Sequence, residues 1–169
     1  IGLLTAGVPI YILVDDESTA ATTHTFNISC GAVAPANDLC SGAIALPCGG
    51  SVVGTTVGAT IDAVGTCGTA LGTAPGVWYT FVGNGGTNVV NTCTGTTYYS
   101  KIGVFRGTCA GLICVAGNDD FCGLQSQVTF ATTLGTTYFV LVTGFGSATG
   151  AFTLTRTSTL PNDLCAGAI

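Results

Sequence analysis

The residues of this sequence that could hold a metal ion are few and lie in predicted turns. Asn118-Asp119-Asp120 stands between two predicted strands. Carboxylate and carbonyl oxygens in such a turn are the ligands that Ca²⁺ takes in proteins. The sequence therefore predicts either a calcium site at Asn118, Asp119 and Asp120 or a turn whose side chains bond to their own backbone. Calcium is the one cofactor that the residues suggest.

The patterns that catalysis requires are missing. His24 is the single histidine, no G-x-S-x-G motif occurs, and no paired carboxylates stand outside turns. No C-x-x-C spacing typical of zinc sites is present among the nine cysteines. We therefore expect a protein that is not an enzyme.

The cysteines are instead expected to form disulfides in an oxidising, extracellular compartment. Their spacing favours two short loops, one closed by Cys40 and Cys48 and the other by Cys109 and Cys114. Cys165 repeats Cys40, so its partner is expected in residues beyond this chain. The sequence leaves the pairing of the remaining cysteines open: Cys30, Cys67, Cys93 and Cys122.

Composition narrows the classes of partner. Charged residues make up 7% of the chain, with three cations and a net charge of −5, so clustered Lys and Arg for binding nucleic acid are lacking. With so few charges, the solubility of the surface must depend on uncharged polar residues, on attached sugar or on burial against neighbouring subunits. Asn27-Ile28-Ser29 is an N-glycosylation sequon, and paired threonines suggest further covalent glycans. The apolar start, Ile1–Val14, is too short to span a bilayer.

A repeat shows how these residues are organised. Asn37–Ile44 (NDLCSGAI) and Asn162–Ile169 (NDLCAGAI) agree at all but one position, 125 residues apart. A period of this length matches one ordinary domain. In addition, Leu4–Val14 resembles Leu134–Val142, and His24–Ser29 resembles Gly150–Thr155.

These repeats predict three parts. Residues 1–34 are expected to be C-terminal strands of a preceding unit or strands donated to a neighbour. Residues 35–160 form a complete domain, and residues 161–169 start the next repeat. The apolar residues of the first part need a partner sheet, which makes them candidate interface residues: Ile10, Tyr11, Ile12, Leu13 and Val14.

The complete domain is predicted to be all-β. Strand-like runs separated by Gly, Asn and Asp recur along it, and helical periodicity is nearly absent. Gly83-Asn84-Gly85-Gly86 indicates a hairpin, and the continuous apolar run Tyr138–Val142 indicates a central strand. We expect an antiparallel, disulfide-stabilised β-sandwich or jelly roll of about eight strands. They are Val52–Val57, Val77–Val82, Asn88–Thr92, Lys101–Arg106, Leu112–Gly117, Gln125–Ala131, Thr137–Thr143 and Ala151–Thr157.

About half of the chain, from Val77 onward, resembles the bacterial pre-peptidase C-terminal domain. The resemblance rests on Trp78-Tyr79-Thr80-Phe81, on Ile102–Phe105 with Asn118-Asp119-Asp120, and on Gly135–Val142 with Gly150–Leu154. It implies a small secreted β-sandwich that serves as an accessory or structural module. Ser100 stands where members of that group often carry an Asp, which weakens the calcium site that the resemblance would imply.

Two functions follow as expectations. The first is a structural subunit of an extracellular filament or cell-surface stalk, glycosylated, whose partner is another copy of itself through strand complementation or tandem packing. The alternative is an accessory module of a secreted hydrolase or adhesin that binds glycan or protein. For that alternative Trp78 is expected in the core. One of the neighbours Tyr98 and Tyr99 must point outward and could stack on a sugar.

Overall fold

The structure is a computed structural model that describes residues 11–13, 23, 25 and 32–159. The chain divides into two compact units, Ile1–Cys30 and Gly31–Ile169. Among the described residues of the second unit, every strand lies between Ile44 and Thr159, and the one helical element is a short 3₁₀ turn, η1 (Cys40–Gly42).

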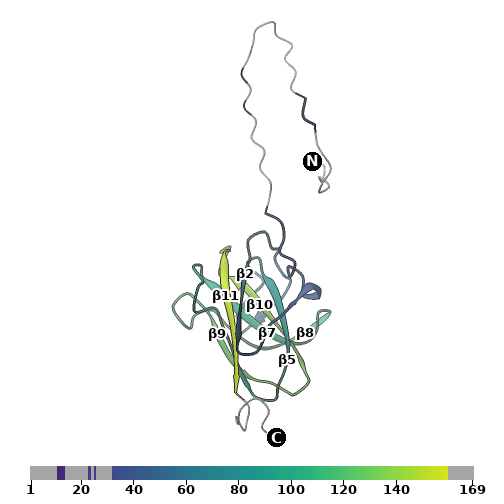
Figure 1. Cartoon of the computed structure of the whole chain (residues 1–169), viewed down its shortest axis with the longest axis vertical. Helices are drawn as coiled ribbons and strands as arrows, with labels where there is room; N and C mark the ends of the chain where they lie inside the picture. The colour runs from purple at the N-terminus through teal and green to yellow at the C-terminus, as the bar shows by residue number, and fades with distance from the viewer. Residues whose placement is uncertain (1–10, 14–22, 24, 26–31, 160–169) are drawn as a thin grey trace. The chain divides into compact units, whose positions relative to one another are not determined.

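All eight predicted strands are present, which confirms the all-β prediction. A four-stranded sheet has the order β2-β11-β6-β9, and a five-stranded sheet has the order β1-β5-β10-β7-β8 (Figure 1). The strands are β1 (Ile44–Ala45), β2 (Gly50–Thr55), β5 (Val77–Val82), β6 (Thr87–Asn91), β7 (Ser100–Thr108), β8 (Gly111–Asn118), β9 (Gln127–Ala131), β10 (Thr137–Gly144) and β11 (Ala151–Thr159). A separate hairpin pairs β3 (Thr66–Cys67) with β4 (Thr69–Ala70).

The connections make this sandwich a jelly roll. The first long strand, β2, lies beside the last, β11, and from β5 onward the chain passes between the two sheets at every connection except the β7–β8 hairpin. The predicted hairpin at Gly83–Gly86 is therefore wrong, because β5 and β6 belong to different sheets. The predicted central strand is confirmed, since β10 pairs with β5 on one side and with β7 on the other.

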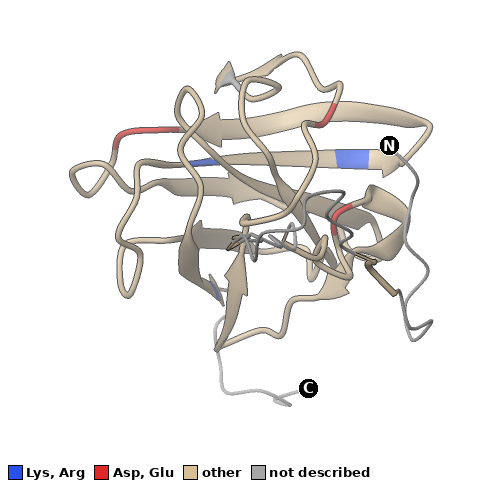
Figure 2. Cartoon of the chain, turned by 90° about the horizontal axis from the view of Figure 1, so that it is seen from above, with Lys and Arg blue, Asp and Glu red and all other residues tan. Residues whose placement is uncertain are grey.

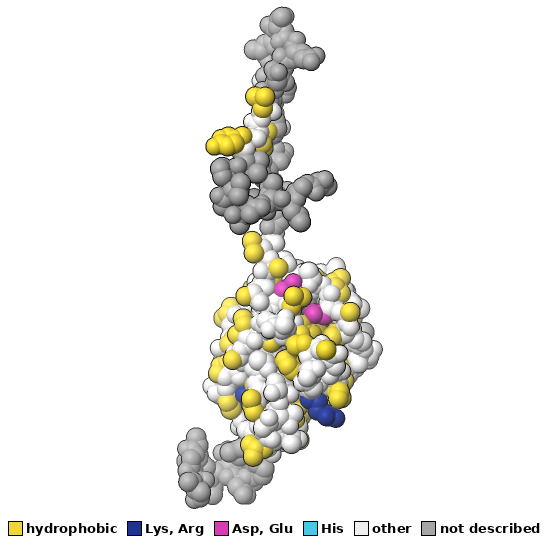
Figure 3. Space-filling view, turned by 90° about the vertical axis from the view of Figure 1, so that its right-hand side faces the viewer, with side chains coloured by type: hydrophobic (Ala, Val, Ile, Leu, Met, Phe, Trp, Pro, Cys, Tyr) yellow, Lys and Arg dark blue, Asp and Glu magenta, His cyan; other side chains and the backbone are white. Residues whose placement is uncertain are grey.

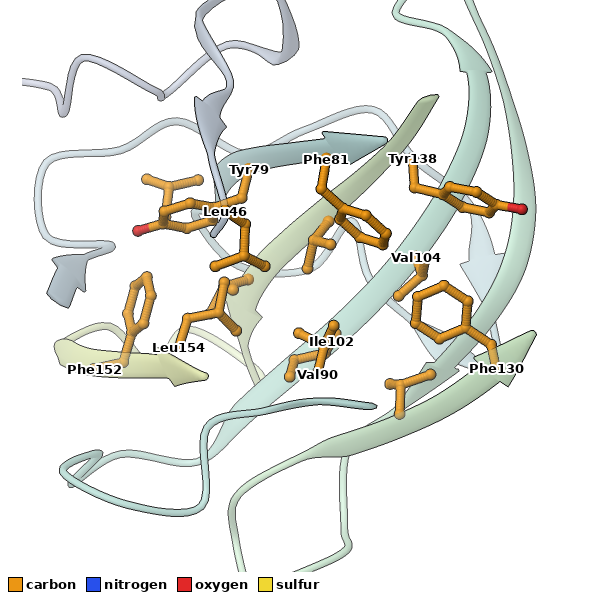
Figure 4. Close-up of a cluster of buried hydrophobic side chains, with 14 residues drawn as sticks. Leu46, Tyr79, Phe81, Val90, Ile102, Val104, Phe130, Tyr138, Phe152 and Leu154 are labelled. Carbon is orange, nitrogen blue, oxygen red and sulfur yellow. The ribbon is translucent and has the colours of Figure 1, made fainter. Parts of the chain in front are cut away.

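The main core fills the space between the two sheets. Side chains that alternate along the strands meet there, as Figure 4 shows for Tyr79 and Phe81 of β5 opposite Phe152, Leu154 and Phe130. Tyr79 and Phe152 pack edge to face with their ring centroids 6.1 Å apart. Burial of these apolar surfaces is the main force that holds the two sheets together.

A second core covers the outer face of the five-stranded sheet. Trp78, Phe105 and Leu141 point away from the main core and are covered by Cys67 and Leu71 of the β3–β4 region. Gly103 in β7 makes room for this cover, because a Cβ there would collide with Leu71. Trp78 is thus in a core, as predicted, although not in the one between the sheets.

Three disulfides join the described cysteines, and they differ from the predicted pairs. The bonds are Cys40–Cys109, Cys67–Cys114 and Cys93–Cys122, and Cys48 is free and exposed. The predicted Cys109–Cys114 pair fails because Cys114 pairs with Phe105 within the β8 ladder. This register places it more than about 10 Å along an extended strand from the turn that holds Cys109. The predicted Cys40–Cys48 pair fails because η1 lies against the β7–β8 turn, where Cys109 bonds Cys40.

Charged side chains are sparse on the described unit and form no basic patch (Figure 2). Arg156 is buried, as are Asp38 and Lys101. Its guanidinium lies 3.8 Å from the centroid of the Phe81 ring, and its Nε donates to Oδ1 of Asn88 over 2.9 Å. Burial lowers the pKa of Arg156. The Arg156 side chain is therefore part of the core packing and is not a surface charge.

Candidate interface at the ends of the sandwich

The first copy of the repeated segment is built into the start of the sandwich. Asn37 is buried, its carbonyl accepts the backbone N–H of Trp78 over 2.8 Å, and its Nδ2 donates to the Trp78 carbonyl over 2.9 Å. Asn37 therefore fixes the incoming chain beside the first residues of β5. We call residues 37–46 the entry clasp.

Asp38 is the second fixed point of the entry clasp. Its Oδ1 accepts the backbone N–H of Thr60 over 2.6 Å, and its Oδ2 accepts the Thr60 hydroxyl over 3.0 Å. Charge-assisted bonds of this kind are stronger than bonds between neutral groups. The carboxylate consequently ties the clasp to the 56–62 loop, which follows β2.

The rest of the entry clasp is bound by a disulfide, a strand and the core. Cys40 bonds Cys109, Ile44–Ala45 pairs in parallel with Tyr79–Thr80 of β5, and Leu46 packs in the main core (Figure 4). A Cβ on Gly42 would lie 2.6 Å from the Ala36 carbonyl oxygen, so glycine is needed there. The repeat keeps each of these residue types up to Ile44 and changes only the exposed Ser41, to Ala166.

A second carboxylate lies close to Asp38. Asp62 accepts the indole N–H of Trp78 over 2.7 Å, and its other oxygen is buried without a hydrogen-bond partner. Burial and the neighbouring Asp38 raise the pKa of Asp62 to about 6, against the lowering effect of the indole hydrogen bond. Sequence reasoning missed this residue because it stands alone in a stretch of small residues, without a motif around it.

The chain enters and leaves the sandwich at opposite ends. The entry pole holds the clasp contact at Trp78 and the loops that follow β2, β6, β8 and β10. The exit pole holds residues 83–86, residues 132–136 and Thr159, which pairs with Thr87. In Figure 1 residues 32–38 (dark blue) lie above the sandwich and the yellow strand β11 ends below it. The two poles are thus separated by the full length of the strands.

Exposed apolar side chains occur at both poles. At the exit pole, Val82 is 60% exposed and Leu134 is 76% exposed. At the entry pole, exposed apolar side chains come from three loops; they are Val57, Ile61, Phe121, Leu124 and Phe145. Figure 3 shows hydrophobic side chains beside acidic ones near the upper end of the described unit. Exposed apolar side chains that gather at one end of a unit are typical of surfaces that contact another molecule.

The predicted calcium turn lies at the entry pole, and its side chains accept hydrogen bonds from other groups of the protein. Asp119 accepts the Thr69 hydroxyl over 3.0 Å, Asp120 accepts the Tyr99 hydroxyl over 2.7 Å, and Asn118 Oδ1 accepts the backbone N–H of Gln127 over 3.4 Å. In the described part of the chain, no three His, Cys, Asp or Glu side chains form a group suited to a metal ion. The two carboxylates thus point to different partners, and the calcium site stays a prediction.

Tyr99 is the outward member of the tyrosine pair and stacks on Phe145. Their ring centroids are 4.5 Å apart and the planes differ by 10°. The hydroxyl bond to Asp120 holds the Tyr99 ring in place and raises the pKa of Tyr99 to about 12. A rigid aromatic pair therefore lies at the entry pole.

The predicted interface strand is described in part. Tyr11, Ile12 and Leu13 are exposed within their own unit. Ile10, Val14 and the sequon residue Asn27 lie outside the described residues, as does the second copy of the repeated segment. On the sandwich itself, β2 is a sheet edge that pairs only with β11, and its Val53 is 81% exposed.

Compared with known proteins, the chain matches no family model and no curated sequence. The resemblance to the pre-peptidase C-terminal domain thus stays a prediction. Across the described residues no helix has the length and hydropathy of a membrane span. Three disulfides indicate an oxidising environment, such as that of secreted proteins.

Proposed function

We propose that this protein is a structural subunit of an extracellular filament or cell-surface stalk, built from β-sandwich units that follow one another end to end. One observation carries the proposal: the chain enters at one pole and leaves at the other, and residues 162–169, two residues beyond the last strand, repeat residues 37–44 of the entry clasp at all but one position. A unit with this arrangement extends an array along its strand direction.

The filled sheets favour tandem packing for the N-terminal segment. Residues 10–14 resemble the part of β10 that ends at Val142, and in the sandwich β10 and β11 each have strand partners on both sides. A second copy of these strands therefore has no vacancy in this sandwich. Residues 1–30 fit instead as the β10 and β11 strands of a preceding unit that has no other strands at those positions, where their apolar side chains would be buried.

Scarcity of charge supports an assembled state. With 7% charged residues and exposed apolar side chains at both poles, the unit lacks the charged surface that keeps isolated domains apart. The hydroxyl side chains of β11 (Ala151–Thr159, AFTLTRTST) give positions for covalent glycan, which would supply the missing hydration. Glycosylation at Asn27 and at exposed threonines belongs to this proposal.

The test is electron cryo-microscopy of the secreted, assembled protein. We expect filaments with a regular axial repeat and additional density at glycosylated residues. Deleting Ile1–Ser29 should abolish assembly and leave the sandwich folded, as judged by its thermal unfolding. Dispersed single particles in the native material would contradict the filament, and filaments formed by the truncated chain would exclude a role for the N-terminal strands.

The stacked pair of Tyr99 and Phe145 favours a second candidate, an accessory module that binds glycan. Phe145 is 50% exposed, and aromatic faces suit the apolar faces of sugar rings. Such a module should remain monomeric and lose glycan binding on Tyr99→Ala. Glycan-array binding that does not change in this variant would exclude the candidate.

A further inference from the structure

We infer that consecutive units touch directly, with Val82 and Leu134 at the exit pole of one unit packed on the entry pole of the next beside Val57 and Ile61. The inference rests on the proposed end-to-end array. It adds the surface and the partner: the occupant of each exit pole is a second copy of the same unit.

The length of the connection brings the poles together. β11 ends at Thr159, and the second copy of the clasp sequence begins at Asn162, so two residues intervene. Three Cα–Cα steps of about 3.8 Å reach at most about 11 Å. Asn37, the counterpart of Asn162, is buried against Trp78. If the next unit binds its clasp in the same way, the entry pole of that next unit therefore lies within side-chain reach of Thr159 of the preceding unit.

Exposed apolar residues lie at both of the poles that this junction joins. At the exit pole, the loops of Val82 and Leu134 are joined because Gly83 donates to the Thr136 carbonyl and Gly135 donates to the Gly83 carbonyl. At the entry pole, Val57 and Ile61 flank Thr60, the residue that binds Asp38 of the clasp. Both surfaces are therefore fixed before they meet, which lowers the entropic cost of contact.

Charge also differs between the poles. The four acidic residues of the described sandwich lie at the entry pole: Asp38, Asp62, Asp119 and Asp120. Arg106 is exposed in the half of β7 nearer the exit pole, where it pairs with Tyr138 near the start of β10. Lys101 lies in the entry half but is buried. Figure 3 shows the acidic side chains near the upper end and the cationic ones lower down. Stacking one unit on the next thus brings opposite charges closer.

Direct contact sets the axial repeat. The nine residues of β11 cover about 30 Å. With a connection of up to about 11 Å, the repeat is at most about 40 Å, and the angle between units is constant because a packed interface fixes it.

The experiment compares filaments of the full-length chain with two variants, imaged by electron cryo-microscopy. Leu134→Asp places a charge in the contact and is expected to cause loss of the constant angle between units. Val53→Asp is the matched control, because Val53 is exposed to a similar degree but lies on the β2 edge. Thermal unfolding of both variants should match that of the wild type, since both side chains are exposed.

Each outcome decides a separate point. A repeat of about 40 Å or less that becomes irregular only in Leu134→Asp supports direct contact. A repeat well above 40 Å, or a Leu134→Asp filament as regular as the wild type, overturns the contact and leaves the filament intact. Loss of regularity only in Val53→Asp assigns the junction to the β2 edge instead. Absence of filaments from the wild type contradicts the proposed function itself.

Discussion

Trp78 donates its indole N–H to Oδ1 of Asp62 over 2.7 Å, at the point where the entry clasp meets β5. The same residue bonds Asn37 through its backbone. The single tryptophan of the chain therefore reports on the carboxylates and on the clasp together.

Asp62→Asn is expected to stabilise the protein at pH 8 by about 1 kcal/mol. The pKa of Asp62 is raised from 3.8 to about 6, so the folded chain holds this proton more tightly than the unfolded chain. The stability that this proton contributes is complete below pH 3.8 and is lost as the pH rises through 6. The expected gain in the free energy of unfolding is smaller than the full value of about 1.4 kcal/mol per pKa unit, because the Asp62 side chain is partly exposed.

The measurement is guanidinium unfolding at pH 3.5 and pH 8, followed by Trp78 fluorescence. Asp120→Asn, on an exposed turn, serves as the control and should give no gain at pH 8. An equal gain for Asp62→Asn at both pH values would show that proton binding is not its cause.

Asp38→Ala is expected to lower the free energy of unfolding by about 2–3 kcal/mol, because it removes two charge-assisted hydrogen bonds, one from the backbone N–H and one from the hydroxyl of Thr60. Ser41→Ala, which reproduces the second copy of the repeat, should change it by less than about 0.5 kcal/mol. Chemical unfolding of the two variants checks this. Similar losses in both would mean that the clasp contacts do not determine which positions the repeat keeps.

The disulfides give a prediction for mass spectrometry. Peptides of the unreduced protein should be linked as Cys40–Cys109, Cys67–Cys114 and Cys93–Cys122, and a thiol reagent should label Cys48 in the folded chain. Replacing both Cys40 and Cys109 with Ala should cost about 2–4 kcal/mol of stability. A peptide that links Cys40 to Cys48 would instead support the pairing expected from local spacing.

Arg156→Lys is expected to destabilise the sandwich by about 2–3 kcal/mol although it keeps the positive charge. Lysine cannot cover the Phe81 ring while bonding both Asn88 and the Leu46 carbonyl, as the guanidinium does. Arg106→Lys, at an exposed position, is the matched control and should be neutral within about 0.5 kcal/mol. Thermal unfolding of the two variants would refute the argument if their losses were alike.

The long strands were predictable because each carries its own signal. Val128 and Phe130 alternate with polar residues, and the run Tyr138–Val142 is apolar throughout, so each indicates its place in a sheet. Two-residue strands such as Thr66–Cys67 have no periodicity and were missed. The turn at Gly83–Gly86 was recognised, but a turn does not tell whether the next strand stays in the same sheet.

The candidate site was predictable only where it repeats. Asp38 and Cys40 stood out because the same residue types return 125 positions later, at Asp163 and Cys165. Asp62 and Cys109 gave no such signal, because their roles depend on loops that only the folded topology brings to the clasp. Disulfide pairing failed for the same reason: short spacing favours closure only where the chain is free to bend back.

Because the chain enters this sandwich at one pole and leaves it at the other, every unit of an array points in the same direction. The two tips of such a fibre are then chemically different. One tip presents acidic loops and a clasp, and the other presents uncharged loops with Leu134. A cell could therefore anchor the fibre by one tip and present the other to its surroundings, with no separate adaptor needed to set the orientation.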